Sequence, residues 1–153
     1  MGEKDIAEKK FADHNDVFAD IVNGLLFHGK QMISPESLTP AQTRSQYKAD
    51  NGKLHEMERD TSKYWNEGNV QIALYGFEYQ SKVDPLMPFR VIGYDGTSYR
   101  SQLLKGSKNV FPVITLVLHF GTDHKWDKPK NLKGLMKIPD WLDEAVNDYK
   151  IHV

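Results

Sequence analysis

The chain lacks cysteine altogether among its 153 residues. Disulfide bridges and thiolate metal sites are therefore excluded, and a reducing compartment such as the cytoplasm is favoured. Long hydrophobic runs are also missing, since no stretch approaches the roughly 18 apolar residues that a membrane-spanning helix needs. The N-terminus has no apolar core of the kind found in signal peptides. These absences predict a cytoplasmic protein without a membrane span.

An excess of charge of either sign is missing too, because the formal net charge is only −1. Such a chain has no overall attraction for nucleic acid, so any DNA contact must come from local basic patches. Two lysine-rich stretches, at 125–133 and 105–108, are candidates, although a solvated loop is the simpler explanation for each. The length fits one domain with a proper core.

The strongest strand candidate is the apolar run Val70–Phe77, which leads into Glu78 and Gln80. It carries apolar residues on both alternating sides, as a strand covered on both faces would. Alternation places Glu78 and Gln80 on the side of Ile72 and Leu74. A carboxylate and an amide at the end of a buried strand cost free energy unless they find partners. This strand end is therefore the first candidate for a functional site.

Hydrophobic periodicity and turn residues predict the remaining elements. The predicted helices cover 9–27 and 89–104, the predicted strands cover 31–33, 70–77 and 110–120, a short helical patch lies near 139–145, and a further strand opens at 147–153. The order is helix, short strand, an ambiguous segment, strand, helix and strand. That order defines a mixed α/β domain.

The ambiguous segment is 53–65, which allows two interpretations. Its apolar residues recur near helical spacing, which favours a helix. The competing interpretation is a strand through Asp60 that pairs with 70–77 across the turn at Asn66–Asn69. The choice decides where Asp60 points.

Acidic residues of three predicted elements could converge on one point. Glu78 ends a strand, Asp60 lies on a neighbouring element, and Asp16 or Asp20 lies on a polar helix edge shared with Asn23. Carboxylates gathered in this way repel one another unless a cation is bound, and hard oxygen ligands suit Mg²⁺ or Mn²⁺. Such a cation lowers the pKa of a bound water and stabilises charge on a phosphoryl oxygen. Spacing alone is weak support, because acidic residues are common.

Four stretches of the chain form a more specific set. They are Phe18–Gln31, Glu58–Asp60, Gly76–Gln80 and Met87–Asp95. Together and in this order they resemble the recombination-promoting nuclease (Rpn) or putative transposase family of the PD-(D/E)XK nuclease superfamily. The resemblance implies a restriction-endonuclease-like core, with a central mixed sheet flanked by helices. We expect one such domain over residues 1–153, cut short at its C-terminus.

The resemblance also implies a site and an activity, the metal-dependent cleavage of DNA phosphodiesters. Asp60 stands at the family's Asp position and Glu78 at the following acidic one, both as metal ligands, with Asp20 as the acid from the first helix. Gln80 stands where many superfamily members have lysine. An amide cannot act as a base, but it can orient a water or a phosphate. Lys82, on the same strand face, is a candidate for the missing positive charge.

Two hypotheses about function follow. The first is a Mg²⁺- or Mn²⁺-dependent DNA endonuclease in which Asp60, Glu78 and Gln80 are catalytic. The second is a catalytically silent module that keeps the nuclease fold and binds nucleic acid or a protein, which Gln80 and the modest charge would fit. A homodimer is a further expectation.

Overall fold

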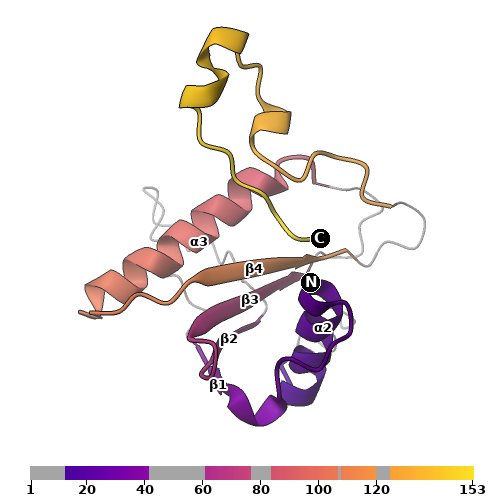
Figure 1. The fold of residues 1–153 in the computed structure, drawn as a ribbon, viewed down its shortest axis with the longest axis vertical. Coiled ribbons are helices and arrows are strands. Elements are labelled where there is room, and N and C mark those ends of the chain that lie inside the picture. The colour runs from indigo at the N-terminus through magenta and orange to yellow at the C-terminus, as the bar shows by residue number, and fades with distance from the viewer. Residues whose placement is uncertain (1–12, 42–60, 77–83, 107, 120–124) are drawn as a thin grey trace, which may run out of the picture.

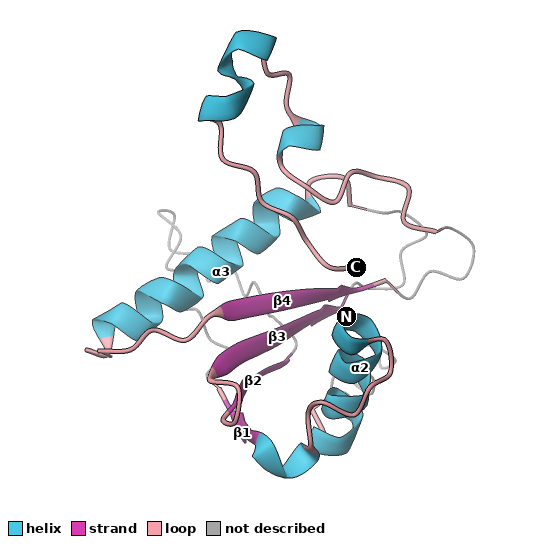
Figure 2. Ribbon diagram, in the orientation of Figure 1, coloured by secondary structure: helices cyan, strands magenta, loops and turns pink. Residues whose placement is uncertain are grey.

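The computed structural model describes residues 13–41, 61–76, 84–106, 108–119 and 125–153. Over these ranges the chain builds one mixed sheet with a long helix on each side (Figures 1 and 2). The helices are α2 (Asn15–Phe27) and α3 (Met87–Leu104), the strands are β1 (Leu38–Pro40), β2 (Thr61–Trp65), β3 (Val70–Gly76) and β4 (Val113–Leu118), and the 3-10 helices are η1 (Pro35–Ser37), η2 (Lys133–Leu135) and η3 (Asp140–Ala145). The predicted mixed α/β class is confirmed.

The sheet has the strand order β1-β2-β3-β4, in which β2 is antiparallel to both β1 and β3, and β4 is parallel to β3. A parallel pair needs a crossover connection, which α3 supplies. Thr61 lies opposite Leu74, and Leu74 lies opposite Leu116. As a result, β2 begins at the same edge at which β3 and β4 end. We call this the carboxyl edge.

The face of the sheet under α2 is largely apolar. Ile72, Leu74 and Leu116 project from it into one cluster with Phe18 and Val22 of α2. Burying a large apolar side chain contributes about 1.5–3 kcal/mol, so this cluster is the main source of stability on that side. The stripe that predicted the helix from sequence is the face that it buries.

Helix α2 stops where glycine was expected to stop it. His28 and Gly29 adopt left-handed backbone conformations, with φ of 53° and 86°. The Gly29 N–H donates to the Asn23 carbonyl at 2.9 Å, which satisfies one of the last carbonyls of the helix.

The predicted strand at 31–33 is wrong, and the Asn23 side chain explains why. Its Nδ2 donates to the Ile33 carbonyl and its Oδ1 accepts from the Ile33 N–H, both at 2.9 Å. These bonds replace the ladder that a strand would have formed. Asn23 is therefore buried, and it does not continue the polar edge of Asp16 and Asp20.

The strand interpretation of the ambiguous segment is confirmed for its described part. Residues Thr61–Trp65 form β2 and pair with β3 across the Asn66–Asn69 turn. Gly68 lies so close to the Trp65 ring that an added Cβ would be 2.2 Å from it, so only glycine fits the turn there. Asp60 itself precedes the described residues of this strand.

The C-terminal predictions are confirmed in part. The patch near 139–145 is the 3-10 helix η3. The expected strand at 147–153 is reduced to isolated bridges, with His152 parallel to Leu116 and Lys150 antiparallel to Asn131. Neither described helix has the length and apolar character that a membrane crossing requires.

Candidate functional site

The residues predicted to be catalytic, Asp60, Glu78 and Gln80, lie outside the described residues, as does Lys82. The elements beside them are described. Asp60 immediately precedes β2, and Glu78 follows the end of β3 by two residues. Because β2 and β3 are antiparallel neighbours, the chain enters one and leaves the other at the carboxyl edge.

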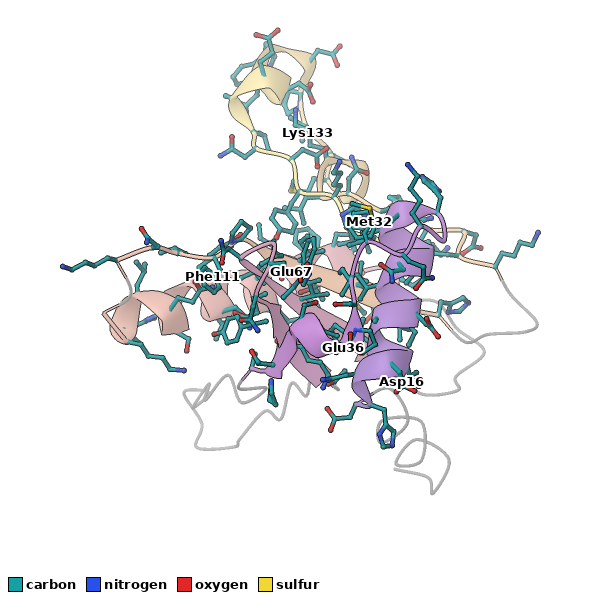
Figure 3. The ribbon with its side chains drawn as sticks, turned by 60° about the horizontal axis from the view of Figure 1, so that its bottom comes forward. Asp16, Met32, Glu36, Glu67, Phe111 and Lys133 are labelled. Atoms are coloured by element: carbon teal, nitrogen blue, oxygen red, sulfur yellow. The ribbon has the colours of Figure 1, made fainter. Side chains whose placement is uncertain are left out.

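The predicted helix acid, Asp20, is exposed on α2, and Asp16 is exposed near the start of the same helix (Figure 3). In the described part of the chain, no three His, Asp or Glu side chains come close enough together to hold a metal ion. The role of Asp20 as a metal ligand therefore stays a prediction.

A different acid, Asp13, reaches β2. Its Oδ1 accepts a hydrogen bond of 2.9 Å from the Thr61 hydroxyl and lies 3.7 Å from the Lys63 ammonium. Asp13 therefore contacts the residue that follows Asp60. Sequence reasoning missed it because the predicted helix began near residue 9, whereas α2 begins at Asn15 and leaves Asp13 in the preceding turn. An acid just before a helix start was the available signal.

Lys63 is the one charged side chain that β2 buries on the α2 side, at 5% exposure. Its ammonium lies 5.7 Å from the centre of the Phe18 ring and within ion-pair distance of Asp13. A buried ammonium is costly unless it is paired. The largely apolar face of the sheet thus carries a positive charge close to the carboxyl edge.

The opposite face of the sheet, under α3, holds a polar layer formed by Ser62, Gln71, Asp95, Gln102 and Thr115, all of them buried. The Thr115 hydroxyl donates to Asp95 at 2.5 Å, and the Tyr149 hydroxyl donates to the other oxygen of the same carboxylate. Asp95 therefore ties α3 to β4 and to the C-terminal segment. Burial, together with the hydrogen bond to Asp95, raises the pKa of Tyr149 well above its usual range.

The rest of the polar layer is a chain of amides. Gln71 donates to the Ser62 hydroxyl at 3.1 Å, and Gln102 donates to the Gln71 carbonyl oxygen at 3.4 Å. Gln102 also pairs with the backbone of Phe111, accepting from its N–H at 2.7 Å and donating to its carbonyl at 3.1 Å. Because these polar groups satisfy one another, we regard the layer as structural and do not assign it to a binding site.

Within the segment 125–153, the part that carries η2 and η3 forms an arm that projects away from the sheet, and the chain then returns to β4 at His152 (Figures 1 and 3). At its base, the Leu132 N–H donates to the Tyr149 carbonyl at 3.0 Å. Asp148 accepts from the Asn131 side chain and the Lys133 N–H, and these bonds lower the pKa of its carboxyl group. The base is thereby held as a paired loop.

The predicted basic stretch at 125–133 lies at this base. Lys125, Lys128 and Lys130 are exposed, whereas Lys133 pairs with Asp143 at 3.3 Å (Figure 3). Three exposed lysines therefore lie in one short segment. Trp126 of this segment contacts His119, the residue after β4, with ring centres 5.8 Å apart, so the segment passes near the carboxyl edge.

The fold and these features define an α/β domain with acidic and basic side chains around one edge of its sheet. Residues 63–153, more than half of the chain, match the family described as "Putative transposase, YhgA-like". The chain belongs to this family, and the resemblance seen in the sequence is confirmed. Membership in a transposase family implies interaction with DNA. No curated protein and no solved structure matches the chain.

Proposed function

We propose that the chain is a metal-dependent DNA endonuclease with a restriction-endonuclease-like core, whose ligands Asp60 and Glu78 meet at the carboxyl edge. The observation that supports this most is the antiparallel pairing of β2 with β3. Neighbouring strands lie about 4.8 Å apart, so the chain before β2 and the chain after β3 leave the sheet close together, and we propose that the two carboxylates converge there on one ion. Ligand bonds near 2 Å would not bridge carboxylates more than about 8 Å apart.

The chemistry of the donor set fits a hard divalent cation. Carboxylates that adjoin two neighbouring strands in the sequence, with Asp13 hydrogen-bonded to the first residue of β2, are the oxygen ligands that Mg²⁺ and Mn²⁺ prefer. Asp60 and Glu78 would hold the ion, and the Gln80 amide would orient a water or a phosphate oxygen. When bound, the ion would supply a lower pKa for a coordinated water and neutralise phosphoryl charge.

DNA would need a positive surface beside this edge, because the net charge of the chain is −1. Lys125, Lys128 and Lys130, exposed at the base of the arm, fit that role. Contacts of this kind hold the phosphate backbone without reading sequence, and they weaken as salt rises.

The test is plasmid cleavage in Mg²⁺, with EDTA as the blank. We expect Asp60→Ala and Glu78→Ala each to lower the cleavage rate by about 100-fold or more, since each removes a ligand of the ion. Glu144→Ala, which changes an exposed acid on η3 that has no part in the proposed site, is the matched control and should cleave at the wild-type rate. Cleavage that survives both ligand substitutions would rule out this site.

A matched pair of substitutions decides which acid completes the site. Asp13→Asn keeps an oxygen that can accept from Thr61 but removes the charge, and Asp20→Asn removes a charge from the exposed side of α2. If Asp13 contributes, the first variant loses cleavage and the second retains it. The reverse result assigns the role to Asp20.

The second candidate function is a silent nuclease-fold module that binds DNA or a protein, which the glutamine at position 80 favours. Calorimetric titration with Mn²⁺ separates the two functions. Heat of binding that disappears in Asp60→Ala supports the endonuclease. Absence of binding at millimolar Mn²⁺ supports the silent module.

A further inference from the structure

The outer face of α3, turned away from the sheet, carries a stripe of exposed residues that no packing in the described chain accounts for. Leu86, Phe89 and Leu103 are large apolar side chains with 53%, 41% and 62% of their surface exposed. The stripe runs along one side of the helix because its spacing alternates between three and four residues. The outer stripe consists of Leu86, Phe89, Gly93, Gly96, Arg100 and Leu103.

Two glycines occupy the middle of the outer stripe. Gly93 and Gly96 are exposed, and a Cβ added at either would meet nothing within 4 Å. Glycine inside a helix costs about 0.5–1 kcal/mol relative to alanine, and no contact within the described chain requires it at these positions. Close approach of a second helix would require glycine here, because residues without side chains let two helix backbones pack at a short distance.

We propose that the outer stripe is a dimer interface, on which α3 of a second copy packs antiparallel with its crossing point between Gly93 and Gly96. A two-fold axis at that point sets Gly93 beside the partner's Gly96. The same axis sets Phe89 beside the partner's Arg100 and Leu86 beside the partner's Leu103. The stripe is thus complementary to itself, as a symmetric dimer interface has to be.

Charge selects this arrangement over a parallel one. Arg100 is exposed within the outer stripe, and a parallel pair would bring the two Arg100 side chains together. In the antiparallel pair each guanidinium lies over the partner's Phe89 ring, a favourable cation–π contact. At the start of α3, Asp84 pairs with Arg90 at 3.0 Å, so this end adds no unpaired positive charge that would repel the partner's Arg100.

The expected strength follows from the size of the interface. Helix α3 has 18 residues, so it is about 27 Å long at 1.5 Å per residue. One helix pair buries less than the roughly 1,200–2,000 Å² of a tight complex, so we expect a dissociation constant on the order of micromolar. This interface is independent of the proposed nuclease site, since the outer stripe faces away from the sheet.

Sedimentation equilibrium from about 1 to 100 µM tests the dimer, whose mass is twice the 17.6 kDa of the chain. Gly93→Leu places a bulky side chain at the crossing, and we expect it to weaken dimerisation by about tenfold or more. The substitution raises helix propensity, so a melting curve at low concentration should show a fold at least as stable. Gly24→Leu on α2 is the matched control, because a Cβ there also meets nothing within 4 Å.

Cross-linking tests the geometry, since the chain has no cysteine of its own. Phe89→Cys and Arg100→Cys are oxidised separately and as a mixture. The antiparallel pair predicts a disulfide-linked dimer only in the mixture, because each position faces the other and lies far from its own copy. A chain that stays monomeric to about 100 µM, a Phe89→Cys variant that links to itself, or a Gly24→Leu variant that weakens the dimer as much as Gly93→Leu would each overturn the proposal.

Discussion

The two faces of the sheet are built from the same strands but bind their helices in different ways. Under α2, apolar side chains such as Ile72 and Leu116 pack on Phe18, an attraction that has little directional preference. Under α3, much of the contact is made by buried hydrogen bonds, among them those of Asp95 and Gln102. Hydrogen bonds demand particular distances and angles.

The two helices are therefore positioned by different forces. Apolar area holds α2 against the sheet and supplies stability, whereas the polar layer fixes the rotation and height of α3. Asp95 and Gln102 lie on one side of α3, seven residues apart. Asp95 accepts a hydrogen bond from Thr115 in β4, and Gln102 donates to the Phe111 carbonyl just before β4. Rotation of α3 would break both sets, so the outer stripe is held in a fixed direction.

The largest effect on stability is expected from removing a core side chain between α2 and the sheet. Phe18→Ala removes the largest fully buried side chain of that cluster and should lower the free energy of unfolding by about 3–5 kcal/mol. Urea unfolding followed by circular dichroism measures it. Phe89→Ala, at an exposed phenylalanine, is the control and should change stability by less than about 0.5 kcal/mol in dilute protein. Equal losses would contradict the assignment of the core.

The next effect comes from the polar layer. Asp95→Ala leaves the hydroxyls of Thr115 and Tyr149 without their acceptor and should cost about 2–4 kcal/mol. Thr115→Val removes one donor with its shape kept and should cost about 1 kcal/mol. The same urea experiment applies. An Asp95→Ala variant no weaker than Thr115→Val would show that the carboxylate does not act as a shared acceptor.

A smaller effect, dependent on pH, is expected from Tyr149→Phe. Loss of the hydrogen bond to Asp95 should cost about 1 kcal/mol at neutral pH. Because folding raises the pKa of Tyr149, its stabilising contribution is complete below its ordinary pKa of about 10 and is lost as pH rises beyond that value. Thermal unfolding between about pH 8 and 11 should therefore show a steeper alkaline decline for the wild type. Parallel profiles would contradict the environment described for this tyrosine.

The smallest change in stability is expected at Lys63, the charge on the apolar side. Lys63→Met keeps roughly the length of the side chain and removes the buried ammonium. The free energy of unfolding should therefore stay the same or rise by about 1 kcal/mol. A stability loss of the size expected for Phe18→Ala would show that Lys63 is a stabilising partner of Asp13. Cleavage measured on the same variant tells whether the charge serves the carboxyl edge.

The elements that the sequence predicted well are those that its local periodicity decides. The apolar stripes of α2 and α3 and the runs in β3 and β4 each specify an element with little help from the rest of the chain. Helix α3 forms in spite of Gly93 and Gly96, whose cost the polar layer and the apolar contacts of its inner face outweigh.

The elements that the sequence predicted poorly depend on distant partners. Thr61–Trp65 reads as helical by periodicity, and its pairing with β3 makes it a strand. The strand predicted at Ile33 does not form, because the side chain of Asn23, ten residues earlier, bonds both backbone polar groups of Ile33. Asp13 approaches β2 because α2 begins later than the apolar pattern suggested. The roles of Asp60 and Glu78 stay predictions.

Both outer edges of the sheet are closed to further strands. At one edge β1 is three residues long and includes Pro40, which has no N–H to offer. At the other, the Val117 N–H of β4 donates to the His152 carbonyl at 2.8 Å. Unsatisfied strand edges act as templates for aggregation, and this sheet offers little such template within the described residues. The dimer proposed above accordingly uses the face of α3 and neither edge of the sheet.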